Sequence, residues 1–333
     1  MGVISLPDVP YGATAVRPAW ADLPMELRTV IGARLGSPVV WATSAGGGFT
    51  RGFAGVLDTE AGQRFFVKAA SLEHERHLAD WQYREVSITG ALPEAVPAAR
   101  PRWSLTAAGY YATCLDAIDG AVPLLPWTAP DLRAALDAWA TAADALADPP
   151  AELLALDLPP LSYLLEHDLS WWAEIAGGRE PEPALPSWAT ARHGELLDEL
   201  VALEKLAPGY GRGDGVIHGD LRLDNVMVDK AGRGWICDWT WCCRGAPFFD
   251  TATLLVTAHA SGLDADGLFA AHPTARDVPA EALDAMLASM AGYWLTRADS
   301  GPSSASPYIR GHQRWSGNMA LHWLATRRGW LTT

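Results

Sequence analysis

The chain has 333 residues, of which 49% are hydrophobic and 19% are charged, and its formal net charge at pH 7 is −14. A chain of this length and composition is globular rather than disordered, and it can form one large domain or two moderate ones around a full hydrophobic core. The acidic balance argues against a nucleic-acid partner, because proteins bind phosphate backbones with lysine and arginine.

The sequence predicts a cytoplasmic protein with no membrane partner. Its first residues lack a basic segment followed by a long apolar run, the pattern of a signal peptide. No uncharged apolar stretch approaches the roughly 18–20 residues of a membrane span. We expect reduced thiols rather than a zinc site, because the spacing of the cysteines matches no zinc pattern. The four cysteines are Cys114, Cys237, Cys242 and Cys243.

The first third of the chain is predicted to contain most of the β-structure. A Pro-rich irregular arm over 1–22 precedes a short helix over 23–35, which ends near Gly36 as helices commonly do. Another helix is expected over 72–91, before prolines at 93, 97 and 101 interrupt the chain. Strands, two of them joined by a short Gly-containing turn, are expected at 38–43, 53–58, 64–69 and 110–115.

Beyond residues 116–120 the pattern becomes mainly helical, so the expected class is α+β. The segment Thr128-Ala129-Pro130-Asp131 has the form of a capping box with proline early in the helix. Further helices are expected at 161–176, 187–206, 247–260, 279–298 and 307–327.

The segment Ser44–Gly52 is rich in glycine and lies between two predicted strands. Glycine lets backbone N–H groups approach phosphate oxygens closely. The segment is not a Walker loop, because no Gly-Lys-Ser/Thr follows and no helix begins after it. Two interpretations remain open: a plain turn, or a loop in which Gly46, Gly47 and Gly48 bind a nucleotide.

Lys68 is the next candidate, because it places a charge inside the apolar strand Phe65-Phe66-Val67-Lys68-Ala69. Burying an ammonium group is costly unless the group is paired. Lys68 is therefore either an edge-strand lysine that faces water or a lysine that is held by a carboxylate. The candidate partners on the following helix are Glu73, Glu75 and Glu85.

The most informative motif runs from His218 to Asn225 and reads His-Gly-Asp-Leu-Arg-Leu-Asp-Asn. The spacing H-x-D-x-x-x-x-N is that of the kinase catalytic loop. Phosphoryl transfer from ATP needs one carboxylate to receive the proton of the acceptor hydroxyl, and an amide and a second carboxylate to hold Mg²⁺. We therefore predict Asp220 as the base and Asn225 and Asp238 as magnesium ligands, which fits the preference of Mg²⁺ for oxygen.

The neighbours of these residues are expected to support them. His218 is interpreted as an architectural residue that bonds backbone near Asp238 rather than as a proton shuttle, and Asp224 as a brace of the loop. Two interpretations of Arg222 remain open. It neutralises charge on the transferred phosphate, as a catalytic residue, or it forms a structural salt bridge.

The motif from His218 to Asn225 and the segment around Asp238 resemble the signature of the aminoglycoside phosphotransferase family of small-molecule kinases. That signature is H-G-D-x-x-x-x-N followed by an I-D-W or V-D-W strand. Here the second segment reads Ile236-Cys237-Asp238-Trp239, with one extra residue. The resemblance, over roughly residues 40–260, implies a bilobal protein-kinase-like fold. Its small β-rich N-lobe would span residues 1–115, its hinge 116–120 and its larger, mainly helical C-lobe 121–333.

The resemblance also implies ATP and Mg²⁺ as cofactors. Lys68 would hold the α- and β-phosphates, and Glu85 best matches the glutamate that holds such a lysine. Main-chain groups of the hinge, around Leu115, Ala117 and Ile118, would meet the purine edge. Asp250 matches a family aspartate that we interpret as structural.

The acceptor is expected to bind among the later helices, the most variable part of the family. Tryptophans there either line an acceptor pocket or pack in the core. The acidic residues either contact ammonium groups of a cationic acceptor, which a negative surface attracts, or form a solvated face. They are Asp264, Asp266, Asp277, Glu281 and Asp284.

The leading hypothesis is an ATP- and Mg²⁺-dependent phosphotransferase acting on a hydroxyl of a small molecule, with an aminoglycoside-like antibiotic or another secondary metabolite favoured. The first alternative is a kinase of a primary metabolite such as choline, homoserine or a sugar. A second is a nucleotide-binding pseudokinase with a regulatory role, which the joint presence of Lys68, Asp220, Asn225 and Asp238 disfavours. A third is a metal-dependent hydrolase that uses His218 and Asp220. The oligomeric state is not predicted.

Overall fold

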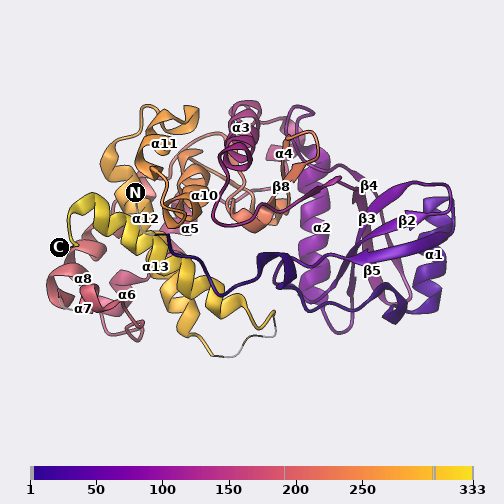
Figure 1. Ribbon diagram of the computed structural model, residues 1–333, viewed down its shortest axis with the longest axis horizontal. Helices are drawn as coiled ribbons and strands as arrows, with labels where there is room; N and C mark the ends of the chain where they lie inside the picture. The colour runs from indigo at the N-terminus through magenta and orange to yellow at the C-terminus, as the bar shows by residue number, and fades with distance from the viewer. Residues whose placement is uncertain (1–3, 191, 302, 304, 332–333) are drawn as a thin grey trace.

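The smaller lobe is built on a five-stranded antiparallel sheet with the order β1-β2-β3-β5-β4 (Figure 1). The structure, a computed structural model, describes residues 4–190, 192–301, 303 and 305–331. The strands are β1 (Val39–Ser44), β2 (Phe53–Thr59), β3 (Arg64–Ser71), β4 (Pro101–Ala107) and β5 (Tyr110–Asp116).

Two helices cover this sheet, and the alternation of side chains along β3 explains how they do so. Phe65 and Val67 are buried in the cluster that contains the apolar face of α1 (Met25–Leu35). Lys68 points the other way and bonds to α2 (Arg76–Ala91). Successive side chains of a strand face opposite sides, so one strand serves both the core of the small lobe and the space between the lobes.

Most of the predicted elements of this lobe are confirmed, and one was missed. α1 ends at Gly36, whose φ of 76° is the left-handed conformation that favours glycine. Strand β4 was not predicted, because Pro101 was interpreted as a break in the chain. Pro101 is instead the first residue of an edge strand that pairs only with β5. An edge position tolerates proline because one row of its backbone groups needs no partner.

The larger lobe is mainly helical, as predicted. Thr128 caps α3 by accepting a hydrogen bond from the backbone N–H of Asp131 at 3.2 Å. Its helices are α3 (Ala129–Ala145), α4 (Ala151–Leu154), α5 (Leu161–His167), α6 (Trp172–Ala176), α7 (Ser187–Thr190), α8 (His193–Glu204), α9 (Ala207–Tyr210), α10 (Phe248–Ala260), α11 (Ala265–Ala271), α12 (Ala280–Asp299) and α13 (Ile309–Arg328). Its short strands are β6 (Gly120–Ala121), β7 (Val216–Ile217), β8 (Val226–Asp229), β9 (Gly234–Ile236) and β10 (Cys243–Arg244).

The predicted helix over 161–176 is in fact two helices. The buried carboxylate of Glu204 accepts hydrogen bonds from the backbone N–H groups of Trp171, Trp172 and Ala173, at 2.7, 3.0 and 2.9 Å. N–H groups at the start of a helix have no partner within the helix. A distant glutamate therefore supplies the cap that starts α6, and nothing in the local sequence indicates it. Likewise, the helix predicted over 187–206 divides into α7 and α8.

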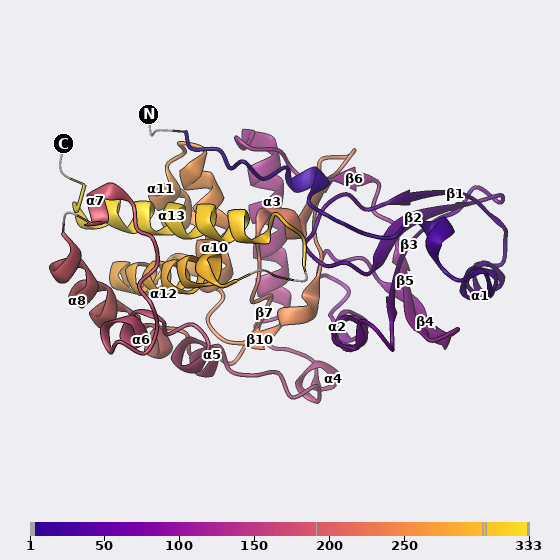
Figure 2. The ribbon, with the colours of Figure 1, turned by 90° about the horizontal axis from the view of Figure 1, so that it is seen from below.

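The N-terminal arm packs against both lobes, although residues 1–115 were predicted to form the small lobe. The N–H of Ser5 donates to the carbonyl of Ala260 at 2.9 Å, and Nε1 of Trp315 donates to the carbonyl of Ser5 at 3.1 Å. Val9 and Tyr11 are buried in the core of the large lobe. Figure 2 shows the arm running beside α13 before it crosses to the sheet. Residues 4–11 therefore belong to the large lobe by their contacts.

Some expectations concern residues outside the described ranges. Met1–Val3, part of the segment that gave no sign of a leader, lie outside the described residues, as do Pro302 and Ser304 of the loop between α12 and α13. Among the helices that the structure describes, none combines the length and apolar character needed to cross a membrane.

Gly234 on β9 provides a test of the packing between β9 and α3. A Cβ atom at this position would collide with the backbone carbonyl of Ala134 and with Cβ of Ala138. We expect Gly234→Ala to lower the free energy of unfolding by about 1–3 kcal/mol, because overpacking forces backbone to move. Urea denaturation measures the change.

Gly32 is the matched control, since it lies inside α1 and an added Cβ meets no heavy atom within 4 Å. Gly32→Ala is expected to raise stability by up to about 1 kcal/mol, because alanine has the higher helix propensity. Equal effects of the two substitutions would contradict the close approach of β9 to α3.

Candidate functional site

The residues of the two motifs come from the turns around a short β-hairpin of the large lobe. Asp220 lies in the loop after β7, Asn225 ends a single turn before β8, and Asp238 is the second residue after the end of β9. The pairing of β8 with β9 sets Val226 opposite Ile236, so the residues just outside this pair, Asn225 and Cys237, are neighbours. The N–H of Cys237 donates to the carbonyl of Asn225 at 2.8 Å. Two segments that are far apart in the sequence therefore meet at one end of the hairpin.

A cavity of about 270 Å³ brings most of the predicted site residues together between the lobes. The large lobe contributes Asp220, Arg222, Asn225 and Asp238, and the small lobe contributes Gly48, Lys68 and Glu85. The remaining lining residues are Arg17, Phe49, Thr50, Gly52, Leu78, Trp81, Gln82, Asp224, Thr240, Trp241, Ala305 and Ile309.

Lys68 and Glu85 form an ion pair at the small-lobe side of this cavity. Nζ of Lys68 donates to both carboxylate oxygens of Glu85, at 2.8 and 2.7 Å. The side chains are only 19% and 5% exposed, so Lys68 is not an edge-strand lysine facing water. Burial alone would lower the pKa of Lys68, but the nearby carboxylates of Glu85 and Asp238 raise it above its usual value. Lys68 is therefore charged at neutral pH.

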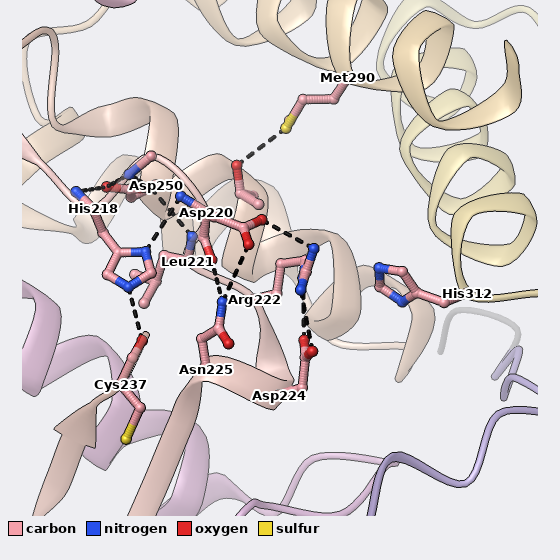
Figure 3. Close-up of polar contacts among 12 residues, drawn as sticks. His218, Asp220, Leu221, Arg222, Asp224, Asn225, Cys237, Asp250, Met290 and His312 are labelled. Carbon is pink, nitrogen blue, oxygen red and sulfur yellow. Dashed lines mark hydrogen bonds and ion pairs between the residues drawn. The ribbon is translucent and has the colours of Figure 1, made fainter. Parts of the chain in front are cut away.

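Asp220, Arg222 and Asp224 form a chain of charges on the other side of the cavity (Figure 3). Arg222 contacts Asp224 at 3.1 Å through both Nε and Nη2, and contacts Asp220 at 3.0 Å through Nη1. Burial raises the pKa of Asp220 to about 7, although the guanidinium of Arg222 acts to lower it. All three guanidinium nitrogens of Arg222 thus face carboxylates, which favours the salt-bridge interpretation of this residue.

Asn225 and Asp238 present oxygen atoms to the cavity. Nδ2 of Asn225 donates to the backbone carbonyl of Asp220 at 2.8 Å and to its carboxylate at 3.3 Å, so the amide oxygen points elsewhere. Asp238 accepts a hydrogen bond from Oγ1 of Thr240 at 2.8 Å. Burial would raise the pKa of Asp238, but Lys68 and the Thr240 hydroxyl bring it below its usual value. Both groups are oxygen donors of the type that Mg²⁺ prefers.

Asp238 also adopts an unusual backbone conformation. Its φ of 60° and ψ of 63° lie in the left-handed region. A residue with a Cβ enters this region at a cost in free energy, and such residues concentrate at functional sites. The conformation lets the chain turn sharply from β9 into the short helix Trp239–Trp241, and it was not predicted from the sequence.

His218 and Asp250 hold the loop that carries Asp220 in place. The carboxylate of Asp250 accepts hydrogen bonds from the N–H groups of His218 at 2.7 Å, Gly219 at 3.0 Å and Leu221 at 3.4 Å. Nδ1 of His218 accepts the N–H of Asp220, so Nε2 carries the proton and donates to the carbonyl of Cys237 at 2.9 Å. Burial lowers the pKa of His218 to about 4. The contact with backbone beside Asp238 is the one expected.

Several residues predicted to bind the nucleotide lie outside this cavity. An added Cβ at Gly46 would collide with the carbonyl of Gly12, and one at Gly47 would lie 2.9 Å from the carbonyl of Tyr11, so both glycines face the arm. Leu115 is buried in the sheet. Ala117 and Ile118 line a second cavity of about 480 Å³, which also contains residues of the β8–β9 turn.

Other residues of the cavity were not predicted. Arg17 comes from the arm, Phe49 from the tip of the glycine-rich segment and Gln82 from α2. Nε of Arg17 and Oε1 of Gln82 are buried and have no hydrogen-bond partner among the residues that the structure describes. Buried polar atoms are nearly always satisfied by protein, water or ligand. The cavity therefore has polar atoms that can still form hydrogen bonds to a ligand, next to its oxygen donors. Its residues fit a Mg²⁺-bound nucleotide.

Comparisons with known proteins agree with the kinase-like fold. A sequence model described as the phosphotransferase enzyme family matches residues 50–286. A thermostable mutant of aminoglycoside phosphotransferase APH(4)-Ia, in ternary complex with AMP-PNP and hygromycin B, is similar with a TM-score of 0.58 and 15% identity, over 92% of this chain and 100% of that chain.

Two further solved structures come from named organisms. Choline kinase LicA from Streptococcus pneumoniae has a TM-score of 0.57 and 13% identity, over 90% of this chain and 98% of that chain. A putative fructosamine-3-kinase from Haemophilus somnus has a TM-score of 0.55 and 12% identity, over 91% and 98%. At these identities the likeness establishes the bilobal kinase-like fold.

The hydrogen bonds to Asp250 generate a prediction. Asp250→Ala leaves the buried N–H groups of the loop without partners, so we expect the free energy of unfolding to fall by about 3 kcal/mol. Asp250→Asn keeps one acceptor oxygen and should lose less. Urea denaturation measures both changes.

Asp198 serves as the control, because its side chain is exposed on α8. Asp198→Asn is expected to change stability by less than about 0.5 kcal/mol. If Asp250→Ala were as stable as Asp198→Asn, the backbone contacts of Asp250 would not hold the loop.

Proposed function

The chain belongs to the phosphotransferase enzyme family, and on that premise we propose that it transfers the γ-phosphoryl group of ATP to a hydroxyl of a small molecule, with Mg²⁺. One observation carries the proposal. Asp220, Asn225 and Asp238 line the same cavity as the Lys68–Glu85 ion pair. Phosphoryl transfer requires a base, two oxygen ligands for the metal and a lysine for the phosphates, each within reach of one nucleotide.

In the proposed reaction, Asp220 orients the acceptor hydroxyl and receives its proton. The acceptor oxygen forms a bond to the γ-phosphorus as the bond to the bridging β–γ oxygen breaks, and ADP leaves. A pKa of about 7 suits a base that works near neutral pH. Arg222, at 3.0 Å, fixes the position of the Asp220 carboxylate. Because the transition state is loose, positioning and charge supply most of the acceleration.

The remaining residues hold the donor. The amide oxygen of Asn225 and the carboxylate of Asp238 would bind Mg²⁺, which when bound neutralises the negative charge of the phosphate oxygens. Lys68 would contact the α- and β-phosphates, and Glu85 keeps its ammonium group in the cavity. Both ring nitrogens of His218 bond to backbone, so this histidine is not available as a metal ligand for the hydrolase alternative.

The acceptor is proposed at the level of a hydroxyl-bearing small molecule. The carboxylates expected to contact a cationic acceptor mostly have partners within the large lobe. Asp266 and Asp284 are paired with Arg327, Glu281 bonds to the hydroxyl of Tyr210, and Asp264 caps α11. Asp284 is also buried, so it does not belong to a solvated face.

These pairings bear on the choice between the proposed acceptors. An aminoglycoside-like antibiotic carries several ammonium groups, and the pairings above leave fewer free carboxylates to bind them. Burial and the charge of Asp220 raise the pKa of Tyr293, and the guanidinium of Arg297 lies 5.8 Å from the ring centroid of Tyr293 and 4.9 Å from that of Trp171. This cationic and aromatic surface favours, as the second candidate, a kinase of a metabolite that is not polycationic.

Asp220→Asn tests the base. The amide cannot accept the proton, so we expect phosphoryl transfer to fall by a factor of at least about 10³ while MgATP affinity changes little. Mass spectrometry of a panel of hydroxyl-bearing antibiotics and metabolites identifies the acceptor by the gain of one phosphate, and isothermal titration measures MgATP affinity. Turnover of the variant at the wild-type rate would assign the base to another residue.

Asp238→Ala tests the metal site through binding alone. We expect affinity for ADP in the presence of Mg²⁺ to fall by about 10-fold or more, because the variant loses a carboxylate ligand of the metal. With EDTA in place of Mg²⁺ the two proteins should bind ADP almost equally. An unchanged affinity for ADP in the presence of Mg²⁺ would mean that residues other than Asp238 bind the metal.

A further inference from the structure

Arg17 extends from the N-terminal arm under the glycine-rich segment between β1 and β2. Nη1 donates to the carbonyl of Gly52 at 2.9 Å and to Oγ1 of Thr50 at 3.2 Å. Nη2 donates to the carbonyl of Gly47 at 3.1 Å. These contacts fix the plane of the guanidinium, and the side chain lines the cavity that holds Lys68 and Asp238.

The charge of Arg17 has no close counterion among the described residues. Within the described part of the chain its hydrogen-bond partners are two carbonyls and a hydroxyl, all neutral, and its Nε is buried without a partner there. Burial lowers the pKa of Arg17, and Asp238 acts against this lowering. A buried charge is usually paired, because taking it out of water is costly. An anion in the cavity would supply the missing partner.

The arm is fixed to the glycine-rich segment at several other points. Oγ1 of Thr14 donates to the carbonyl of Gly48 at 3.0 Å, and the N–H of Ala15 donates to the carbonyl of Gly46 at 2.8 Å. The hydroxyl of Ser306 donates to the carbonyl of Thr14, and its N–H donates to the carbonyl of Phe49 at 2.9 Å. Arg17 is therefore held in place before any ligand binds, which limits the entropy that binding costs.

We propose that Arg17 is a phosphate-binding residue, which the arm places in the nucleotide site as a second cation beside Lys68. The inference rests on the proposed function, since the anion is the phosphate chain of the nucleotide. A guanidinium suits this role because it donates in a plane and binds phosphate oxygens strongly. Lys68 shares its charge with Glu85, whereas Arg17 brings a charge that no carboxylate pairs with directly.

Nucleotide binding to Arg17→Ala and Arg17→Lys tests the proposal without knowledge of the acceptor. Isothermal titration of the full chain with adenosine and with MgADP separates the nucleoside from the phosphates. We expect Arg17→Ala to weaken MgADP binding by about 10- to 100-fold and to leave adenosine binding unchanged, because charge-assisted hydrogen bonds are lost. The affinity of Arg17→Lys for MgADP should lie between that of Arg17→Ala and that of the wild type.

Arg51 is the matched control, because it lies in the same segment but outside the cavity, where its Nε donates to the carbonyl of Ala305. Arg51→Ala should bind MgADP as the wild type does. Thermal unfolding of each variant checks that the fold is kept, and the ratio of MgADP to adenosine affinity measures the phosphate contact in any folded variant.

Several results would overturn the proposal. If Arg17→Ala bound MgADP with wild-type affinity, Arg17 would not contact the phosphates. Tighter binding by this variant would make the arm a plug that competes with the nucleotide. Equal weakening for adenosine and MgADP would mean that Arg17 acts through the shape of the segment. A wild-type protein that binds no adenine nucleotide refutes the proposed function itself, a result distinct from these three.

Discussion

The position of α2 between the lobes is the constraint on which the candidate site depends. Glu85 holds Lys68 of the sheet at 2.7 Å, and the preceding residue, Arg84, donates to the backbone carbonyls of Thr240 and Cys242 at 2.8 and 3.2 Å. These carbonyls follow Asp238 closely in the chain. Two adjacent residues of one helix therefore tie the lysine of the small lobe to the turn of the large lobe that is proposed to bind the metal. A displacement of α2 would therefore disturb the positions of the proposed phosphate ligand and of the proposed metal ligands at the same time.

Apart from that of Arg17, the charges in the cavity are balanced through shared contacts rather than through isolated pairs. Arg222 lies between Asp220 and Asp224, and Lys68 faces both Glu85 and Asp238. Removing one member of a buried pair leaves an uncompensated charge, which costs more than the pair contributes. Asp250 adds a second kind of support, because its oxygens accept hydrogen bonds from backbone N–H groups of the loop that carries Asp220. The geometry of Asp220 thus depends on α10 and on its own loop.

The parts of the fold and site that the sequence predicted are those encoded locally. The characteristic spacing of the motif from His218 to Asn225 lies within eight consecutive residues. Lys68 is recognisable because its charge interrupts an apolar strand. Arg17 could not be found in this way, since its role comes from the arm crossing between lobes. The break before α6 was missed for the same reason, because it depends on Glu204, which is distant in sequence. Strand β4 was missed although its partner β5 follows it closely in the chain, because Pro101 was interpreted as a break.

Net charge is a poor guide to the acceptor, because a formal charge of −14 describes the whole chain and not the site. The acidic residues of the later helices mostly have partners, and the carboxylate of Asp220 contacts the guanidinium of Arg222. Electrostatic attraction at long range depends on the overall charge and is screened by salt, whereas selectivity depends on groups that contact the ligand. An acceptor with several ammonium groups would approach this surface readily and still find few unpaired carboxylates among the acidic residues that were expected to contact it. The contacts around Asp220 therefore weigh more than the composition in choosing the acceptor.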